Sequence, residues 1–290
     1  VLAQRERGAM KRLWMPAAFG VLFKRTAQQT VRDVFVNGVR LLATLALAGT
    51  FGAVWGEQSS VIERTGTIVM ASVNSAMIAM VKALTLFVEE RPVVNRERRY
   101  YGALPYLLSK IMAEGPLDAA FAGLFGSMVH DNCHMLGDKN AFVAAICLQA
   151  LSSSALGQLI GACVPSPAAA LASGPPLMVV LTIVGAVGPS GRPPLPLLME
   201  PLREVSAIRW GCEALCVSEL TAEEFKGSTI AQQADQVKRH AFLQRLGLGG
   251  CTVAGALVGQ AKLLAGCYLV TLGALVVSRP SKLPMLPPEH

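Results

Sequence analysis

The chain has 290 residues, of which 52% are hydrophobic and 16% are charged, and its formal net charge is +7. A soluble domain carries roughly a quarter of charged residues, so this composition argues against a soluble globular protein and favours a membrane protein. A basic chain could also bind nucleic acid, but here lysine and arginine flank apolar runs and form no basic stripe interleaved with aromatic residues. We therefore expect an integral membrane protein with no nucleic-acid partner.

The first predicted element is a basic amphipathic helix within residues 10–33. Leu13, Val21 and other apolar residues recur there at helical spacing, with lysine and arginine on the opposite face. Such helices commonly lie in the membrane interface, so we assign residues 1–33 to a cytoplasmic, interfacial connecting segment. The chain does not begin with Met and shows no signal-peptide pattern, and we expect it to be one part of a longer polypeptide.

Six apolar runs follow, each long enough to cross a bilayer, which takes about twenty residues in a helix. They cover residues 34–56, 66–88, 104–129, 141–163, 168–188 and 250–278. Glycines recur in these runs at spacings of three or four, and small residues on one face let helices pack closely in lipid. These glycines are Gly49, Gly52, Gly56, Gly157, Gly161, Gly255 and Gly259. We predict an all-α, polytopic membrane protein with five helices in residues 34–188 and the last helix and a tail in residues 249–290.

The flanking charges predict the orientation. Lysine and arginine are concentrated before the first run, between the second and third runs, and after the sixth. The short first and third connections contribute only Arg64 and Lys139. By the positive-inside rule, both termini should lie in the cytoplasm, with the protein in the plasma membrane or an organelle membrane.

The longest connection, residues 189–248, is predicted to lie on the external side. It begins with a proline-rich loop and predicts two helices, at about 201–219 and 229–246. Four cysteines lie in or near polar connections, where disulfides are possible if that side is extracellular, although their pairing cannot be read from the sequence. They are Cys133, Cys212, Cys216 and Cys251.

Polar residues inside the apolar runs are costly and usually face a partner or a pathway. Lys110 and Glu114 are four residues apart and can pair along one helix face, with Asp118 one turn further. Lys82 could extend its side chain toward the cytoplasmic interface. For Lys262 we predict no partner.

Neither a metal site nor a catalytic site is predicted. The segment His130-Asp131-Asn132-Cys133-His134 contains ligand types, but adjacent residues in a short loop rarely converge on an ion, and no fourth ligand is evident. A GxxxxGK[ST] phosphate loop does not occur in the sequence, so this chain alone should not hydrolyse ATP. An intramembrane enzyme would need a base beside the serines 152–154, and no histidine lies in another apolar run.

Two separated patterns resemble a known family. The first runs from Arg32-Asp33 through Arg64-x-Gly66, Phe87-Val88-Glu89-Glu90-Arg91-Pro92-Val93-Val94-Asn95-Arg96-Glu97, Tyr101 and Tyr106 to Lys110-x-x-x-Glu114-x-Pro116. The second is Ser206-x-Ile208-Arg209-Trp210-Gly211-x-Glu213-Ala214-Leu215-x-x-x-Glu219. Both are similar to motifs in the transmembrane domain of the ABC transporter G family, the ABC-2 type half-transporters for pigments, sterols and drugs. The likeness covers nearly the whole chain.

The resemblance implies a coupling helix at about residues 89–102 that rests on a nucleotide-binding domain. The coupling residues would be Arg91, Asn95, Arg96, Glu97 and Arg98. In that family the ATPase domain precedes the membrane domain on one polypeptide and is absent from this chain, so ATP and Mg would bind there and this chain would bind no cofactor. The simpler alternative is that these charges only enforce topology.

The resemblance also implies a substrate cavity at the axis of a homo- or heterodimer. Asn74 and Met77 would line it from the second run, opposite Leu181 and Val184, although packing between helices is the simpler role for the first two. In the external segment, Arg209 and Glu213 belong to the second pattern, and the family's acid at Glu213 helps to hold re-entrant helices.

The function implied by the resemblance is ATP-driven export of lipids, sterols or other hydrophobic or amphipathic compounds by alternating access. One alternative is an ABC-2 permease for glycan or drug export whose ATPase is a separate chain. The external segment of about sixty residues favours the G family over that alternative. An intramembrane enzyme is a further, weaker alternative.

Overall fold

The computed structural model describes residues 15–56, 61–97, 101–164, 166–187, 196–222 and 241–277. The regular structure in these residues is helical throughout, which confirms the predicted all-α fold. In chain order the helices are α2 (Met15–Arg32), α3 (Val34–Trp55), α4 (Val61–Glu97), α5 (Ala103–Asn132), α6 (Lys139–Cys163), α7 (Pro167–Gly185), the 3-10 helix η1 (Leu197–Met199), α8 (Glu200–Glu204), α9 (Ala207–Leu220) and α11 (Val253–Val277).

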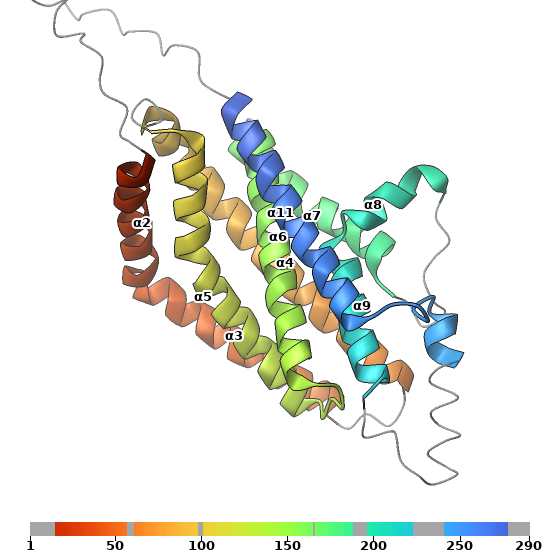
Figure 1. Ribbon diagram of the computed structural model, residues 1–290. Coiled ribbons are helices and arrows are strands. Elements are labelled where there is room, and N and C mark those ends of the chain that lie inside the picture. Colours follow the sequence, from red (N-terminus) through yellow and green to blue (C-terminus); the bar gives the residue numbers. More distant parts are fainter. Residues whose placement is uncertain are drawn as a thin grey trace, which may run out of the picture.

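Helix α6 lies at the centre of the bundle and packs against α4, α5, α9 and α11. Figure 1 shows α2, α3 and α5 on one side of this centre and α7, α8 and α9 on the other. The turn between α4 and α5 and the last residues of α11 lie at one end of the bundle, which we call the Glu97 end. The turn between α5 and α6 lies at the opposite end, the Glu219 end. Successive long helices therefore cross the bundle in alternating directions.

Among the described residues, five helices are long and apolar enough to cross a membrane: α3, residues 62–94 of α4, α6, residues 168–185 of α7, and α11. This confirms a polytopic membrane protein. The remaining predicted span, residues 104–129, corresponds to α5, which has 30 residues and runs through the same bundle (Figure 1). Lys110, Glu114 and Asp118 lower the hydropathy of α5, and all three are buried.

Helix α4 continues beyond the predicted second span. It has 37 residues, contains Pro92, and ends at Glu97. The first part of the segment predicted as a coupling helix, residues 89–102, is therefore the end of α4. Residues 98–100 lie outside the described part of the chain.

Glycines bring the central helices into close contact, as their spacing predicts. A Cβ added at Gly157 of α6 would lie 2.5 Å from the Met80 carbonyl oxygen of α4. A Cβ at Gly161, one turn later, would lie 2.8 Å from the Phe87 ring. At Gly49 of α3 the same change would meet nothing within 4 Å, so only some of the predicted glycines are packing positions.

Helix α9 lies inside the bundle, against α4, α6, α7 and α11. The helix predicted at 201–219 is broken at Val205 and Ser206 into α8 and α9. Ser206 caps α9, because its Oγ accepts a hydrogen bond from the Arg209 amide at 3.3 Å. Most of the second helix predicted for this segment, at 229–246, lies outside the described residues.

Candidate functional site

Six ionisable side chains form one connected network between α3, α4 and α5. Three are cations and three are carboxylates, so their formal charges balance. They are Arg40 of α3, Lys82 and Glu90 of α4, and Lys110, Glu114 and Asp118 of α5, and Lys82 joins the two halves because its Nζ lies 3.8 Å from Glu114 Oε2. A charge inside a membrane protein is tolerated when it is paired, and this pairing is what allows the polar helix α5 to lie in the bundle.

Lys110 is the centre of one half of the network, with a side chain only 1% exposed. Its Nζ lies 2.6 Å from Glu90 Oε2 and 2.7 Å from Glu114 Oε1. Tyr106 donates a hydrogen bond to the same Glu90 oxygen at 3.2 Å. The predicted Lys110 and Glu114 pair is thus present within α5, and Glu90 adds a second helix that the spacing alone did not indicate.

Asp118 is the centre of the other half. It accepts hydrogen bonds from Arg40 Nη2 at 2.8 Å and from Lys82 Nζ at 2.8 and 2.9 Å. The side chain of Lys82 therefore turns to α5, whereas the sequence suggested that it would extend toward the interface. The sequence analysis missed Arg40, although a single arginine in the apolar run 34–56 was a usable signal.

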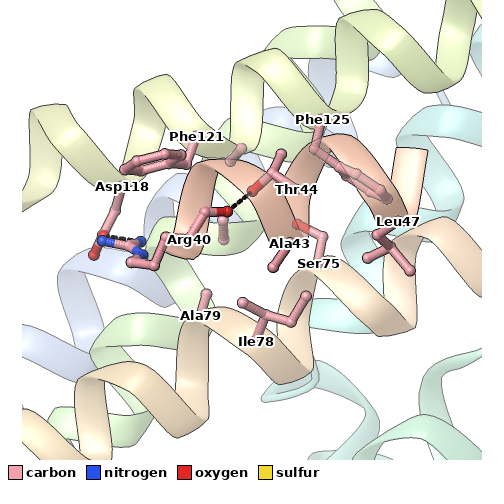
Figure 2. A pocket seen from close by; sticks show the side chains of 12 residues that line it. Arg40, Ala43, Thr44, Leu47, Ser75, Ile78, Ala79, Asp118, Phe121 and Phe125 are labelled. Atoms are coloured by element: carbon pink, nitrogen blue, oxygen red, sulfur yellow. Dashed lines mark hydrogen bonds and ion pairs between the residues drawn. The ribbon is translucent and has the colours of Figure 1, made fainter. Parts of the chain in front are cut away.

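A cavity of about 120 Å³, which we call the chamber, lies beside Asp118. Most of its lining is apolar, and Figure 2 shows Phe121 and Phe125 of α5 across from Ile78 and Ala79 of α4. The full lining is Arg40, Ala43, Thr44, Leu47, Ser75, Ile78, Ala79, Asp118, Phe121, Ala122, Phe125 and Ala150. The bond between Arg40 and Asp118 closes one side of the chamber (Figure 2).

A second cavity of about 210 Å³, which we call the vestibule, lies between α2, α3, α4 and α5. Most of its lining residues carry polar or charged side chains: Thr26, Gln29, Thr30, Asp33, Val36, Asn37, Arg40, Lys82, Thr85, Leu86, Glu89, Glu90 and Glu114. Arg40 lines both cavities, so its ion pair with Asp118 stands at their boundary. A cavity with many charged side chains thus lies next to one with few.

Glu97, one of the predicted coupling residues, joins three segments at the Glu97 end of the bundle. Arg25 of α2 donates to both Glu97 carboxylate oxygens at 2.8 Å, and Tyr101 OH donates to Oε2 at 2.9 Å. The hydrogen bond with Glu97 raises the pKa of Arg25 above its ordinary value. Glu97 thereby connects α2, the end of α4 and the residues just before α5.

The other predicted coupling residues are only partly described. Arg91 donates a hydrogen bond to the Val164 carbonyl at the end of α6. The side chains of Asn95 and Arg96, and the whole of Arg98, lie outside the described part of the structure.

The four residues predicted for a dimer-axis cavity do not line the chamber. Asn74 is half-buried and donates to the Met70 carbonyl oxygen at 3.0 Å, within its own helix. Met77 is also half-buried and packs against the core, while Leu181 and Val184 are buried in α7. Their proposed role depends on a second protomer and stays a prediction.

Glu219 holds the Glu219 end together. Its carboxylate accepts hydrogen bonds from the amides of Leu136 and Gly137 at 2.9 and 2.8 Å, and from Arg64 Nη1 at 2.8 Å. Helix α9 is thus fastened to the α5–α6 turn and to the start of α4. Within α9, Arg209 lies 3.9 Å from Glu213, so the two predicted residues of the external segment are neighbours.

The histidine and cysteine segment near residue 130 has structural contacts in the described chain. His130 Nε2 lies 2.9 Å from the Gly137 carbonyl oxygen, and its ring packs edge-on against Phe142. Burial raises the pKa of the Cys133 thiol to about 11. Because the thiolate is the form that binds metals, this environment disfavours Cys133 as a ligand.

Comparison with known proteins shows to which family the chain belongs. The family model described as ABC-2 type transporter matches residues 17–220. The chain belongs to the ABC-2 type transporter family. The matched range contains the whole ion network, the Glu97 contacts and helix α9.

Two curated relatives show how this ABC-2 chain compares in length. It is 32% identical over 273 residues to ABC transporter G family member 7 of Arabidopsis thaliana, which covers 90% of the chain and 37% of that protein. It is 26% identical over 210 residues to Protein white of Ceratitis capitata, which covers 69% of the chain and 31% of that protein. The chain spans about a third of the length of these curated relatives.

Proposed function

We propose that this ABC-2 chain is the membrane domain of a half-transporter that moves hydrophobic or amphipathic compounds, such as lipids or sterols, across a membrane. The proposal rests on the hydrogen bonds of Glu97 with Arg25 and Tyr101, which we call the Glu97 junction, and on the membership of the chain in the ABC-2 type transporter family. ABC transporters hydrolyse ATP on a domain separate from the membrane domain. A transporter of this kind needs a rigid element that receives force from its motor, and α4 bonded to α2 forms such an element.

The mechanism follows from how α4 is built. Its end at Glu97 is bonded to Arg25 of α2, and its middle carries Lys82, which is bonded to Asp118 of α5. A push on the Glu97 end would therefore move α2, α4 and α5 together. Alternation between inward-open and outward-open states would export a substrate if the two states bind it with different affinity.

The partners of this domain are a nucleotide-binding domain and a second half-transporter. We infer that ATP and Mg bind on the nucleotide-binding domain, and that the dimer is a homo- or heterodimer in the plasma membrane or an organelle membrane. Asn74, Met77, Leu181 and Val184 would then line a cavity at the dimer axis. The resemblance to full-length relatives of the G family and white type favours a motor on the same polypeptide over a separate ATPase chain.

The proposal is tested by breaking the Glu97 junction in the full-length protein. We expect Glu97→Ala, alone or with Arg25→Ala, to reduce ATP-driven transport by up to about fivefold in proteoliposomes while ATP hydrolysis continues, because a partly exposed ion pair contributes up to about 1 kcal/mol to a coupling equilibrium. Transport of a labelled amphiphile and phosphate release are measured on the same samples.

The control is the ion pair of Lys139 with Asp131 at the opposite end, which is 2.6 Å long and whose carboxylate is more exposed than that of Glu97. Lys139→Ala and Asp131→Asn should leave the ratio of transport to hydrolysis unchanged. An unchanged ratio in Glu97→Ala as well would contradict the coupling role.

A further inference from the structure

The vestibule and the chamber meet at one fixed side chain. Arg40 lines both cavities, is bonded to Asp118 at 2.8 Å, and places its guanidinium carbon 4.5 Å from the centre of the Phe121 ring. An ion pair and a cation–π contact on one arginine hold it in a single position. The boundary between a polar and an apolar compartment is therefore built by defined contacts inside one protomer.

The vestibule is acidic. Four carboxylates line it, from Asp33, Glu89, Glu90 and Glu114, against the two cations of Arg40 and Lys82. Lys110 does not line the vestibule but pairs with Glu90 and Glu114. When it is counted as well, the carboxylates still outnumber the cations. A cavity with this balance attracts a cation and repels an anion.

Glu114 is a buried carboxylate with unused hydrogen-bonding capacity. Its side chain is 3% exposed; Oε1 is paired with Lys110 Nζ at 2.7 Å, while Oε2 makes no hydrogen bond with the described residues. The nearest cation to Oε2 is Lys82 Nζ at 3.8 Å, beyond hydrogen-bond distance. Buried carboxylate oxygens normally accept hydrogen bonds, and Glu114 is part of the vestibule wall, so Oε2 is a buried acceptor at this wall without a hydrogen-bond donor from the described chain.

We propose that the vestibule and the chamber of one protomer together bind a cationic amphiphile, with its amine in the vestibule and its apolar chain in the chamber. The ammonium donates to Glu114 Oε2 and lies within the field of Glu89 and Asp33. The apolar part passes the methylene stem of Arg40 and packs between Phe121, Phe125 and Ile78. A polar end beside carboxylates and an apolar end between aromatic rings is the arrangement typical of a small-molecule site.

This site is separate from the cavity proposed at the dimer axis, because α3, α4 and α5 of a single chain form it. Its role as a loading site for the transported compound rests on the proposed function. Binding itself does not, since it needs neither the motor nor the second protomer.

The test is equilibrium binding of labelled dodecylamine to the full-length protein in lipid nanodiscs, with dodecanol and dodecanoate as competitors of equal chain length. We expect dodecylamine to bind about tenfold more tightly than dodecanoate. The vestibule carboxylates attract the ammonium and repel the carboxylate of the ligand, and a difference of about 1.4 kcal/mol in binding free energy is tenfold in affinity. Glu89→Gln should weaken dodecylamine by about threefold and leave dodecanol unchanged, because only the charged head senses the carboxylate.

Two alanines of α3 supply a matched pair for the chamber. Both are exposed, but Ala43 lines the chamber, whereas Ala46 on the same helix does not. Ala43→Leu should weaken dodecylamine and dodecanol alike by about tenfold, because the added methylenes occupy space that the ligand needs, and Ala46→Leu should change neither. Equal effects of the two leucines, or tighter binding of dodecanoate or dodecanol than of dodecylamine, would overturn the proposal.

The Glu97→Ala protein separates the two proposals. Dodecylamine binding that persists in this uncoupled variant supports the site whatever happens to transport. Loss of amine selectivity in a protein that still transports another amphiphile rejects the site and leaves the proposed function standing.

Discussion

Asp118 is the residue on which two cations depend. Arg40 and Lys82 both bond to its carboxylate, which is 5% exposed. If this carboxylate is neutralised, two positive charges remain beside each other in the bundle. If Lys82 is neutralised, Arg40 still compensates Asp118.

The two changes should therefore differ in cost. We expect Asp118→Asn to lower the free energy of unfolding by about 3 to 5 kcal/mol, the usual cost of removing one partner from a buried pair. Lys82→Met should cost less than half of that, because its methylene stem is retained and Arg40 is still paired. Thermal denaturation followed by fluorescence size-exclusion chromatography ranks the two, and equal midpoints would contradict this description of the network.

Glu219 has a comparable position at the opposite end of the bundle. Its carboxylate is 2% exposed and accepts from Arg64 and from two backbone amides. We expect Glu219→Gln to lower the free energy of unfolding by about 2 kcal/mol. The substitution removes the negative charge, and the new NH2 group of glutamine would face the N–H donors that the carboxylate now accepts from. Glu200, which is 45% exposed, provides the control: Glu200→Gln should shift the midpoint very little. A similar shift for both variants would show that Glu219 does not fasten α9.

At the scale of the elements, the contact between α4 and α6 depends on Gly157, whose added Cβ would meet the Met80 carbonyl oxygen. A backbone atom cannot rotate away, so Gly157→Ala must separate the helices, at a cost of about 1 to 3 kcal/mol. Gly49→Ala, in open surroundings, should be neutral or stabilising, because alanine is the better helix former. Thermal denaturation of the two variants tests this: the midpoint of Gly157→Ala should fall, and that of Gly49→Ala should stay the same or rise.

The helices themselves were largely predictable, because long apolar runs have few alternatives in a bilayer. The predicted spans 34–56 and 141–163 correspond closely to α3 and α6. The continuation of α4 to Glu97 was not predicted, since the charges from Glu89 onward end the apolar run from which the span was read. The break between α8 and α9 was also missed, because Ser206 gives its capping signal only when the preceding turn is known.

The site was predictable only where partners are near in sequence. Lys110 and Glu114 are four residues apart, so spacing brought them together. Arg40 and Asp118 are 78 residues apart, and their contact depends on how α3 packs against α5. The cavities likewise depend on packing, which no spacing rule describes.

At the scale of the whole molecule, bonded junctions follow one another along the bundle. Arg25 and Glu97 tie α2 to α4 at one end, the ion network joins α3, α4 and α5 in the interior, and Glu219 ties α9 at the other end. In the proposed mechanism, a displacement that begins at Glu97 would be carried by these side-chain bonds through α4. The proposal requires that the Glu97 end lie on the cytosolic side, where we expect the nucleotide-binding domain.

The side of the membrane on which the Glu97 end lies is thus the most direct test. The natural sequence has no N-x-[ST] glycosylation acceptor, so an inserted one reports its own location. In the full-length protein expressed in eukaryotic cells, an acceptor loop inserted between residues 223 and 240 should be glycosylated, and the same loop inserted after Arg99 should not. Glycosylation after Arg99 would place the Glu97 junction away from ATP and contradict the account.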